Sequence, residues 1–230
     1  MDLDHILFIP DGNRRWAKKR NENPWEGHRV MMETFEVLMD YITKNNIVKN
    51  ISFFAMSRDN FTRRSKEEVK FFIKIINEAF EKFSKNKMIQ ERGVNIKFYG
   101  TWEKILGNKI VSNLKQIEND TKNNKNFFLS ILFAYDGKDE LIEAINSFRS
   151  NKKINENDIR NNLWTKSIPE VDLIIRTGVD KDPHLSGNVL MWQTSYSQLY
   201  FSEKLWPDFN VLEFKKAIND YAKRERRKGK

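Results

Sequence analysis

Short apolar runs alternate with longer amphipathic stretches along the chain, and this alternation predicts the fold. Each apolar run is bounded by turn-forming residues and has the composition that is typical of a buried strand. Pro10 cannot donate to a strand ladder, so the first run ends before it. Strands are therefore expected at residues 5–9, 51–56, 94–99, 127–133, 172–177 and 198–201.

Between these runs, apolar residues recur three and four positions apart, which is the spacing of a helix with one buried face. Helices are expected over the approximate residue ranges 28–43, 65–83, 103–118, 138–148, 156–163 and 211–226. Strands that alternate with helices predict an α/β fold with a mainly parallel sheet. No stretch rich in Gly, Ser or Pro divides the chain, so residues 1–230 are expected to form a single domain.

The composition narrows the class of protein. The chain has 230 residues, of which 39% are hydrophobic and 32% charged, and this balance is typical of a globular domain with a charged surface. No apolar run approaches the roughly 18 residues needed to span a bilayer, and the N-terminus lacks the pattern of a signal peptide. The absence of cysteine excludes disulfides, thiolate metal sites and cysteine nucleophiles. We therefore expect a cytoplasmic location.

The net charge of +9 predicts an anionic partner. Nucleic acid, a membrane surface and a phosphorylated small molecule are all compatible with this charge. Abundant Lys and Asn also follow from genome composition, so the charge alone does not choose among the three partners.

The stretch after the first predicted strand carries the first candidate site. Asp11, Gly12 and Asn13 are turn-forming residues, and five cations follow between Arg14 and Arg20. One interpretation is a site for a phosphorylated ligand with a metal, because ligands of open α/β sheets bind at the carboxyl ends of strands. The other is a tight turn that leads into a solvated basic helix. The residues of this stretch alone support both interpretations equally.

Two further polar clusters follow predicted strands, at Ser57–Arg63 and from Arg176 onward. At one edge of a parallel sheet they would meet Asp11 and Arg15. Mg²⁺ accepts one or two carboxylates together with phosphate oxygens and water, and arginine forks match phosphate oxygens in pairs. The chain has no Walker or dinucleotide-binding glycine loop, so phosphates would be bound here in another way.

An ordered set of motifs gives the chain a resemblance to a known family. The motifs are His5–Trp16, Gly27-His28, Ser57–Arg63, Asp172–Thr177, Trp192–Phe201, Leu205–Phe209 and Arg224–Gly229. Together they resemble the cis-prenyltransferases, the family of undecaprenyl diphosphate synthases, over nearly the whole chain. Each motif alone could arise by chance, whereas the ordered set is specific.

The resemblance implies a Rossmann-like sheet of six mainly parallel strands flanked by helices, a hydrophobic tunnel and a homodimer. It implies Mg²⁺-dependent condensation of isopentenyl diphosphate with an allylic diphosphate primer, farnesyl or geranylgeranyl diphosphate. The product would be a long-chain cis-polyprenyl diphosphate for lipid-carrier synthesis. Peripheral contact with a membrane would serve product release, and no nucleic-acid partner is implied.

By position, the resemblance also implies roles for individual residues. Asp11 would bind the metal and would act in catalysis together with Asn60. Substrate binding is assigned to Gly12, Asn13, Arg14, Arg15, Trp16, His28, Ser57, Phe61, Arg63, Arg176, His184, Ser186, Arg227 and Gly229. The last two would reach across the dimer. Without the resemblance, His28 is equally well explained as a residue at a helix start.

Five positions depart from the family pattern, and Phe61, which replaces a common Trp, is the mildest of these changes. Arg14 stands where bacterial members usually have Gly, which makes the first motif more similar to archaeal members that use geranylgeranyl diphosphate. Pro24 and His184 each stand where a phosphate-binding Arg is expected. Gln198 replaces a Glu that often assists metal binding, and the sequence leaves open whether Gln198 contributes.

Two other functions stay open at this stage. The chain could be a non-catalytic subunit that needs a second chain, although the intact Asp-Gly-Asn motif favours an active enzyme. It could also bind nucleic acid, for which the net charge is the single indication. The primer and the product length are not determined by the sequence.

Overall fold

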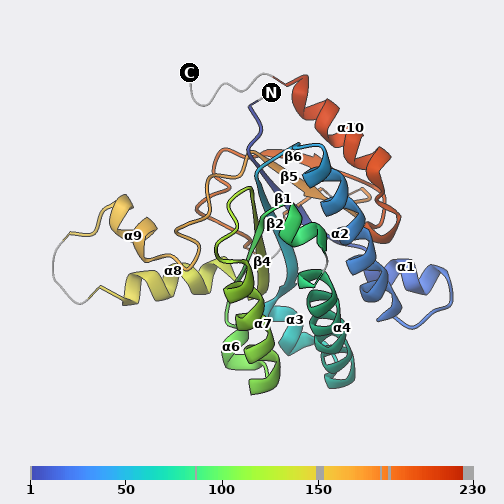
Figure 1. The fold of residues 1–230 in the computed structure, drawn as a ribbon, viewed down its shortest axis with the longest axis horizontal. Coiled ribbons are helices and arrows are strands. Elements are labelled where there is room, and N and C mark those ends of the chain that lie inside the picture. Colours follow the sequence, from blue (N-terminus) through green and yellow to red (C-terminus); the bar gives the residue numbers. More distant parts are fainter. Residues whose placement is uncertain (1, 86, 149–152, 182, 186–187, 225–230) are drawn as a thin grey trace.

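A single six-stranded sheet forms the centre of the protein (Figure 1). The computed structural model describes residues 2–85, 87–148, 153–181, 183–185 and 188–224. The strand order is β3-β4-β2-β1-β5-β6, and every neighbouring pair is parallel. The strands are β1 (His5–Ile9), β2 (Asn50–Ser57), β3 (Val94–Tyr99), β4 (Phe127–Tyr135), β5 (Leu173–Arg176) and β6 (Gln198–Phe201). The predicted α/β class and the six parallel strands are confirmed.

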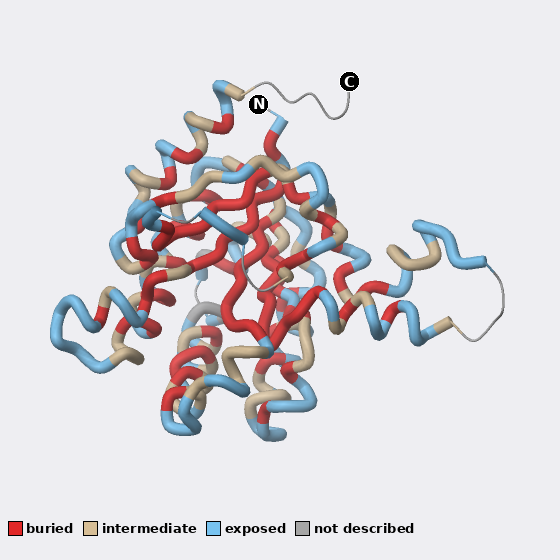
Figure 2. The backbone as a smooth tube through the Cα atoms, turned by 180° about the vertical axis from the view of Figure 1, so that it is seen from behind, coloured by how far each residue is buried: buried red, intermediate tan, exposed pale blue. Residues whose placement is uncertain are grey.

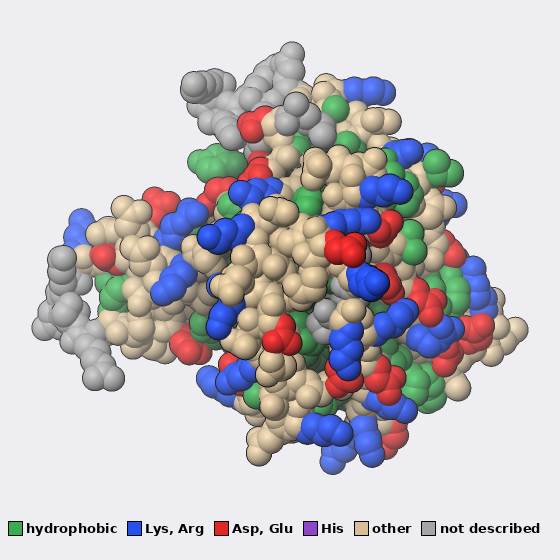
Figure 3. Space-filling view, viewed as in Figure 1, with side chains coloured by type: hydrophobic (Ala, Val, Ile, Leu, Met, Phe, Trp, Pro, Cys, Tyr) green, Lys and Arg blue, Asp and Glu red, His purple; other side chains and the backbone are tan. Residues whose placement is uncertain are grey.

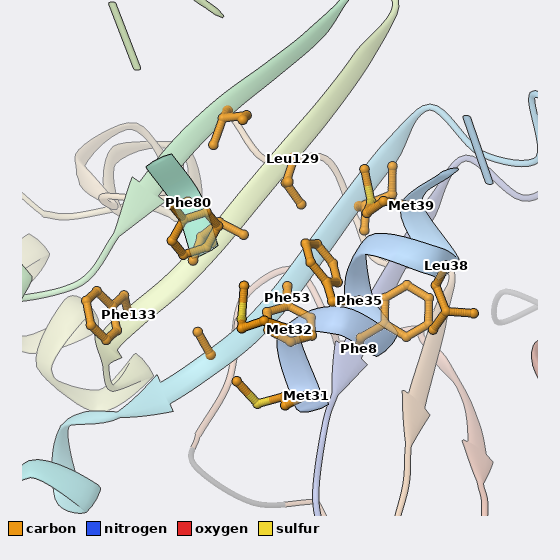
Figure 4. Packing of buried hydrophobic residues seen from close by; sticks show 14 of the residues in the cluster. Phe8, Met31, Met32, Phe35, Leu38, Met39, Phe53, Phe80, Leu129 and Phe133 are labelled. Atoms are coloured by element: carbon orange, nitrogen blue, oxygen red, sulfur yellow. The ribbon is translucent and has the colours of Figure 1, made fainter. Parts of the chain in front are cut away.

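One face of the sheet carries the larger hydrophobic core. Alternate residues of a strand point to opposite faces, and in β1 Ile6 and Phe8 point to this one. Phe35 packs on Phe53 of β2 with ring centroids 4.2 Å apart, and Figure 4 shows this contact beside Phe8. The longer helices that contribute to this core are α2 (Glu26–Lys44), α4 (Lys66–Ser84), α7 (Asn108–Thr121) and α10 (Val211–Ala222).

The opposite face carries a smaller core. Leu7 and Ile9 of β1 point to this face and pack with Ile174 of β5 and with buried residues of the segments 163–171 and 189–190. The residues of the central strands are mostly buried, whereas buried and exposed residues alternate along the outer helices (Figure 2). The helices α8 (Gly137–Asn146) and α9 (Glu156–Asn162) extend from the body as an arm (Figure 1).

The local structure differs from the expectation at several places. The polar turn expected at residues 57–60 is a short helix, α3 (Arg58–Arg63), because the Ser57 side chain accepts a hydrogen bond from the Asn60 amide and caps it. The helix expected at 103–118 is divided into α6 (Trp102–Ile105) and α7 by extended backbone at Leu106 and Gly107. Two short helices were not expected, α5 (Lys87–Glu91) and the 3₁₀ helix η1 (Trp206–Asp208), whereas α1 (Asn13–Lys19) is the basic helix that one interpretation placed after the turn at Asp11.

None of the described helices is long and apolar enough to cross a membrane.

Candidate active site

A cleft of 920 Å³ lies at the carboxyl ends of β1, β2, β4 and β5. From β1 the chain builds the sheet towards β2, β4 and β3, and it then crosses to β5 on the other side of β1. Such a change of direction between neighbouring strands is where open α/β sheets bind ligands. The cleft is rich in cationic side chains, namely those of Arg14, Arg15, Lys18, Arg63, Arg64 and Arg176. The three clusters that the sequence placed at one sheet edge do converge here.

Asp11 lies just beyond the end of β1 and presents its carboxylate to two arginines. Oδ2 is 3.1 Å from Nη2 of Arg176, and Oδ1 is 3.5 Å from Nη2 of Arg15. The Asp11 carbonyl oxygen accepts hydrogen bonds from the Thr177 hydroxyl at 2.9 Å and from the Trp206 amide at 3.0 Å. The backbone is therefore pinned by two other segments, while the carboxylate stays about half exposed in the cleft.

The turn after Asp11 depends on two glycines. Gly12 has φ of +102°, and a Cβ there would lie 2.7 Å from Cδ2 of Leu205. A Cβ on Gly27, near the start of α2, would lie 2.1 Å from the Asn13 carbonyl oxygen. The Asn13 side chain donates to the Pro10 carbonyl at 2.8 Å and closes the turn. Gly27 thus lets α2 pack directly against the turn that carries Asp11, and Gly12 lets the backbone at Leu205 approach the same turn.

Arg176 is buried and its guanidinium is held from two sides. Besides the ion pair with Asp11, Nη2 lies 3.2 Å from Nε2 of His184, and Nη1 donates to the His184 carbonyl oxygen. Among the described residues, no hydrogen-bond partner lies at Nε of Arg176. Arg15 donates to the carbonyl of Gly178, in the loop after β5, at 2.5 Å. One network of ion pairs and hydrogen bonds therefore links the ends of β1 and β5.

The opposite wall of the cleft contains a second network, around His28. The His28 Nε2 lies 3.1 Å from Nη1 of Arg64 and 3.6 Å from Oε1 of Glu68. Burial lowers the pKa of His28; the Glu68 contact opposes this effect and Arg64 adds to it. The ring packs edge-on against Phe72, with centroids 4.9 Å apart. Burial therefore favours the neutral form of the His28 imidazole, which lies between Arg64 and Glu68.

The residues of β2 and α3 have different environments. Ser57 and Asn60 line the cleft, and so does Arg63, whose side chain is 80% exposed and pairs with Asp59 at 3.3 Å. Phe61 does not line it; its ring packs in the core against Phe133, with centroids 5.8 Å apart.

Trp16 also lies outside the lining of the cleft. Its Nε1 donates to Asp208 at 2.8 Å, and the guanidinium of Arg20 stacks 4.1 Å above its ring. Gln198, in β6, accepts from Arg224 at 3.2 Å. Three predicted site residues, Ser186, Arg227 and Gly229, lie outside the described residues.

The cleft contains residues that the sequence did not single out. Asp136 follows β4 as Asp11 follows β1, and Asn188 lies beside it with Nδ2 3.5 Å from Oδ2. Position after a strand is the signal that could have identified Asp136. Glu68 lies in the first turn of α4 and pairs with Arg64, which lies in extended backbone between α3 and α4, and their burial depends on residues from α1 and α2.

The donor set fits one hard cation. In the part of the chain that the structure describes, no three His, Cys, Asp or Glu side chains gather as a metal site. Mg²⁺ needs only one or two carboxylates when phosphate oxygens and water complete its shell. Asp11 meets this requirement, because its half-exposed carboxylate faces the cleft among groups that would bind phosphates.

Comparison with known proteins relates this site to a family. The family model Prenyltransf, of the undecaprenyl diphosphate synthase family, matches residues 9–229. An isoprenyl transferase of Rickettsia typhi is 38% identical over 99% of this chain and 98% of its own. A tritrans,polycis-undecaprenyl-diphosphate synthase (geranylgeranyl-diphosphate specific) of Pyrococcus furiosus is 32% identical over 98% of this chain and 86% of its own.

Solved structures share the fold over their whole length. Lavandulyl diphosphate synthase from Lavandula x intermedia, in complex with dimethylallyl diphosphate, superposes with a TM-score of 0.89 at 25% identity over 99% of this chain and 98% of that one. A probable undecaprenyl diphosphate synthase from Campylobacter jejuni superposes with a TM-score of 0.79 at 28% identity over all of both chains.

Proposed function

The chain belongs to the undecaprenyl diphosphate synthase family of prenyltransferases, and from this premise we propose that it condenses isopentenyl diphosphate with an allylic diphosphate primer. The product would be a long-chain cis-polyprenyl diphosphate that serves as a lipid carrier. The observation that carries the proposal is the Asp11–Arg176 ion pair, set among further arginines at the carboxyl edge of the sheet. It combines a carboxylate for a metal with cations for two diphosphates.

The allylic diphosphate would bind on the side of the cleft that α1 forms. Gly12 and Asn13 shape the turn there, and Arg14 and Arg15 supply the charge. When the bond to the diphosphate breaks, charge develops on both fragments, and fixed guanidiniums stabilise the leaving anion. Asn60 and Ser57, on the opposite wall, would orient the reacting ends, which contributes the positioning part of catalysis.

Isopentenyl diphosphate would bind at Arg176, with His184 and Ser186 beside it. The buried guanidinium is held by Asp11 and His184, so its orientation is set before the substrate arrives. Planar guanidinium forks bind two phosphate oxygens at once. Arg227 and Gly229 would complete this subsite from the partner of a homodimer.

Mg²⁺ would be held by Asp11 and by diphosphate oxygens, and it would neutralise charge on the leaving group when bound. Arg15 and Arg176 already face this carboxylate. Their pairing orients the Asp11 carboxylate towards the cleft.

The growing hydrocarbon chain needs an apolar path away from the cleft. A groove of 260 Å³ lies between α2 and α4, with an apolar floor that includes Met32, Phe35, Phe71, Ile75 and Ala79. Met31, the neighbour of Met32 on α2, lines the cleft itself. We infer that the hydrophobic tunnel runs from the cleft between these two helices, where it would also exclude water.

The homodimer would form through the free edge of the sheet and the arm. Among the strands that the structure describes, β6 has a neighbour on one side only. Large apolar side chains are exposed on the arm and near this edge, including Ile142, Ile145, Tyr196 and Leu199. These exposed apolar side chains support the assignment of this surface to the dimer. The lipid product would leave by peripheral contact with a membrane.

Incubation of the purified chain with radiolabelled isopentenyl diphosphate, Mg²⁺ and either farnesyl or geranylgeranyl diphosphate tests the proposal. Chromatography of the products gives the preferred primer and the chain length. A lack of turnover by the chain alone, restored by a second protein, would indicate a non-catalytic subunit. Salt-sensitive binding to DNA or RNA without turnover would indicate a nucleic-acid-binding protein. Lys and Arg alternate with Asp and Glu on the face that Figure 3 shows.

A further inference from the structure

Glu68 is a buried carboxylate at the start of α4 that contacts cationic groups from two walls of the cleft. Its Oε1 lies 3.5 Å from Nε of Arg14 in α1 and 3.2 Å from Nη1 of Arg64, between α3 and α4. The same oxygen lies 3.6 Å from Nε2 of His28 in α2. The backbone amide of Glu68 donates to the Ser65 hydroxyl at 3.2 Å, and this hydrogen bond fixes the start of α4.

The electrostatic environment keeps Glu68 ionised. Contact with His28 lowers the pKa of Glu68, and the two arginines lower it further, against the opposing effect of burial. With His28 in the neutral form that burial favours, the cluster holds two guanidiniums and one carboxylate. Its net charge is positive, so it attracts an anion although it contains a carboxylate.

Both arginines line the cleft, but they differ in how far they are free to move. The Arg14 side chain is 58% exposed, whereas the Arg64 side chain is 16% exposed. Two guanidiniums repel each other, and an exposed arginine has a large choice of rotamers in water. A shared carboxylate behind them offsets that repulsion and limits this freedom before the ligand binds.

We propose that Glu68 is a positioning residue that holds Arg14 and Arg64 together, so that both guanidiniums receive the diphosphate of the allylic substrate. The inference rests on the proposed function and adds to it a residue that does not touch substrate. It also identifies Arg64, beside the more exposed Arg63, as a diphosphate-binding cation of this wall.

Glu68→Gln tests this role, because it removes the charge and keeps the shape. Glu67→Gln is the matched control, since Glu67 is the exposed neighbour on the same helical turn. In Glu68→Gln we expect the KM for the allylic diphosphate to rise about tenfold or more, as for loss of a charge-assisted contact, with the KM for isopentenyl diphosphate nearly unchanged. A parallel change in both KM values, or no change, would overturn the proposal, because a merely structural role cannot separate the two substrates.

Arg14→Ala keeps the inference testable if Glu68→Gln does not fold, since Arg14 is exposed and its loss leaves the core intact. The same selective rise in KM is expected, and combination with Glu68→Gln should add little. Calorimetric titration with inorganic pyrophosphate provides a readout without turnover: affinity should fall in both variants and persist in Glu67→Gln. If the wild type binds pyrophosphate in this Glu68-dependent way but makes no polyprenyl product, the proposed function fails and the positioning role stands.

Discussion

The Arg176 guanidinium lies 3.1 Å from the Asp11 carboxylate, and this contact joins the ends of β5 and β1 across the point where the strand order changes direction. Arg176 is buried, whereas the carboxylate is about half exposed. A half-exposed carboxylate can exchange a guanidinium for a metal ion at small cost. The pair therefore connects the two proposed diphosphate subsites.

Asp11→Asn should reduce turnover by roughly a hundredfold or more, the effect of removing one charge from an electrostatic site. The amide can still accept a hydrogen bond from Arg176, so the fold should persist in a thermal unfolding experiment. Incorporation of radiolabelled isopentenyl diphosphate gives the rate. Asp4→Asn, an exposed carboxylate before β1, is the control and should leave the rate unchanged. Full turnover in Asp11→Asn would contradict the metal role.

Arg63 and Arg64 are adjacent and make a matched pair of substitutions. Arg64→Ala removes a mostly buried cation that contacts His28 and Glu68, so the KM for the allylic diphosphate should rise about tenfold or more. Arg63→Ala removes an exposed cation paired with Asp59, and exposed pairs contribute little, so its effect should be several times smaller. Steady-state kinetics with varied primer measures both. Equal effects would contradict the assignment.

The sequence predicted the sheet well because buried parallel strands produce apolar runs with clear ends. Those ends also located Asp11 and Arg176, since a residue that follows a strand must lie at the sheet edge. The same reasoning applied to β4 would have found Asp136. Position along the chain was sufficient for these residues.

Side-chain direction could not be predicted in the same way. Phe61 turns into the core against Phe133, and Trp16 turns to Asp208, because contacts from distant segments set their rotamers. The burial of Glu68 likewise depends on His28 and Arg14, which come from other helices. Such contacts become visible only when the helices are packed.

Gly27→Ala should destabilise the protein through the contact between α2 and the turn that carries Asp11. The new Cβ would lie 2.1 Å from the Asn13 carbonyl oxygen, and backbone shifts of this kind cost roughly 1–3 kcal/mol. Gly107→Ala is the control, since a Cβ there meets no heavy atom within 4 Å. Thermal unfolding should show a lower Tm for the first variant only. An unchanged Tm in Gly27→Ala would show that the helix can move aside.

Ala79→Trp should shorten the product, because the indole would fill part of the groove between α2 and α4. Thin-layer chromatography of the dephosphorylated lipids measures the chain length. Ala222→Trp, at the exposed end of α10, is the control for adding the same side chain elsewhere. Products of wild-type length from Ala79→Trp would contradict a tunnel along this groove.

The buried His5 should make the protein less stable in mild acid. Its Nδ1 donates to the Pro169 carbonyl at 3.0 Å, and its Nε2 lies 2.8 Å from the Ser52 hydroxyl oxygen. Burial lowers the pKa of His5 below its ordinary value of 6.5, although the hydrogen bond to Pro169 opposes this. The unfolded chain therefore takes up a proton first as the pH falls.

Neutral His5 contributes fully to stability at a pH above the pKa that it has in the unfolded chain. This contribution is lost as the pH falls towards the lower pKa that His5 has in the folded protein. The free energy of unfolding should decrease between about pH 7 and pH 5, by up to about 1.4 kcal/mol per pH unit for each proton taken up. Urea titrations across this range should give a shallower dependence for His5→Gln. Burial also lowers the pKa of His28, so the contribution of His28 to the pH dependence of the free energy of unfolding should remain in His5→Gln. A variant as pH-dependent as the wild type would show that His5 can be protonated in the folded state.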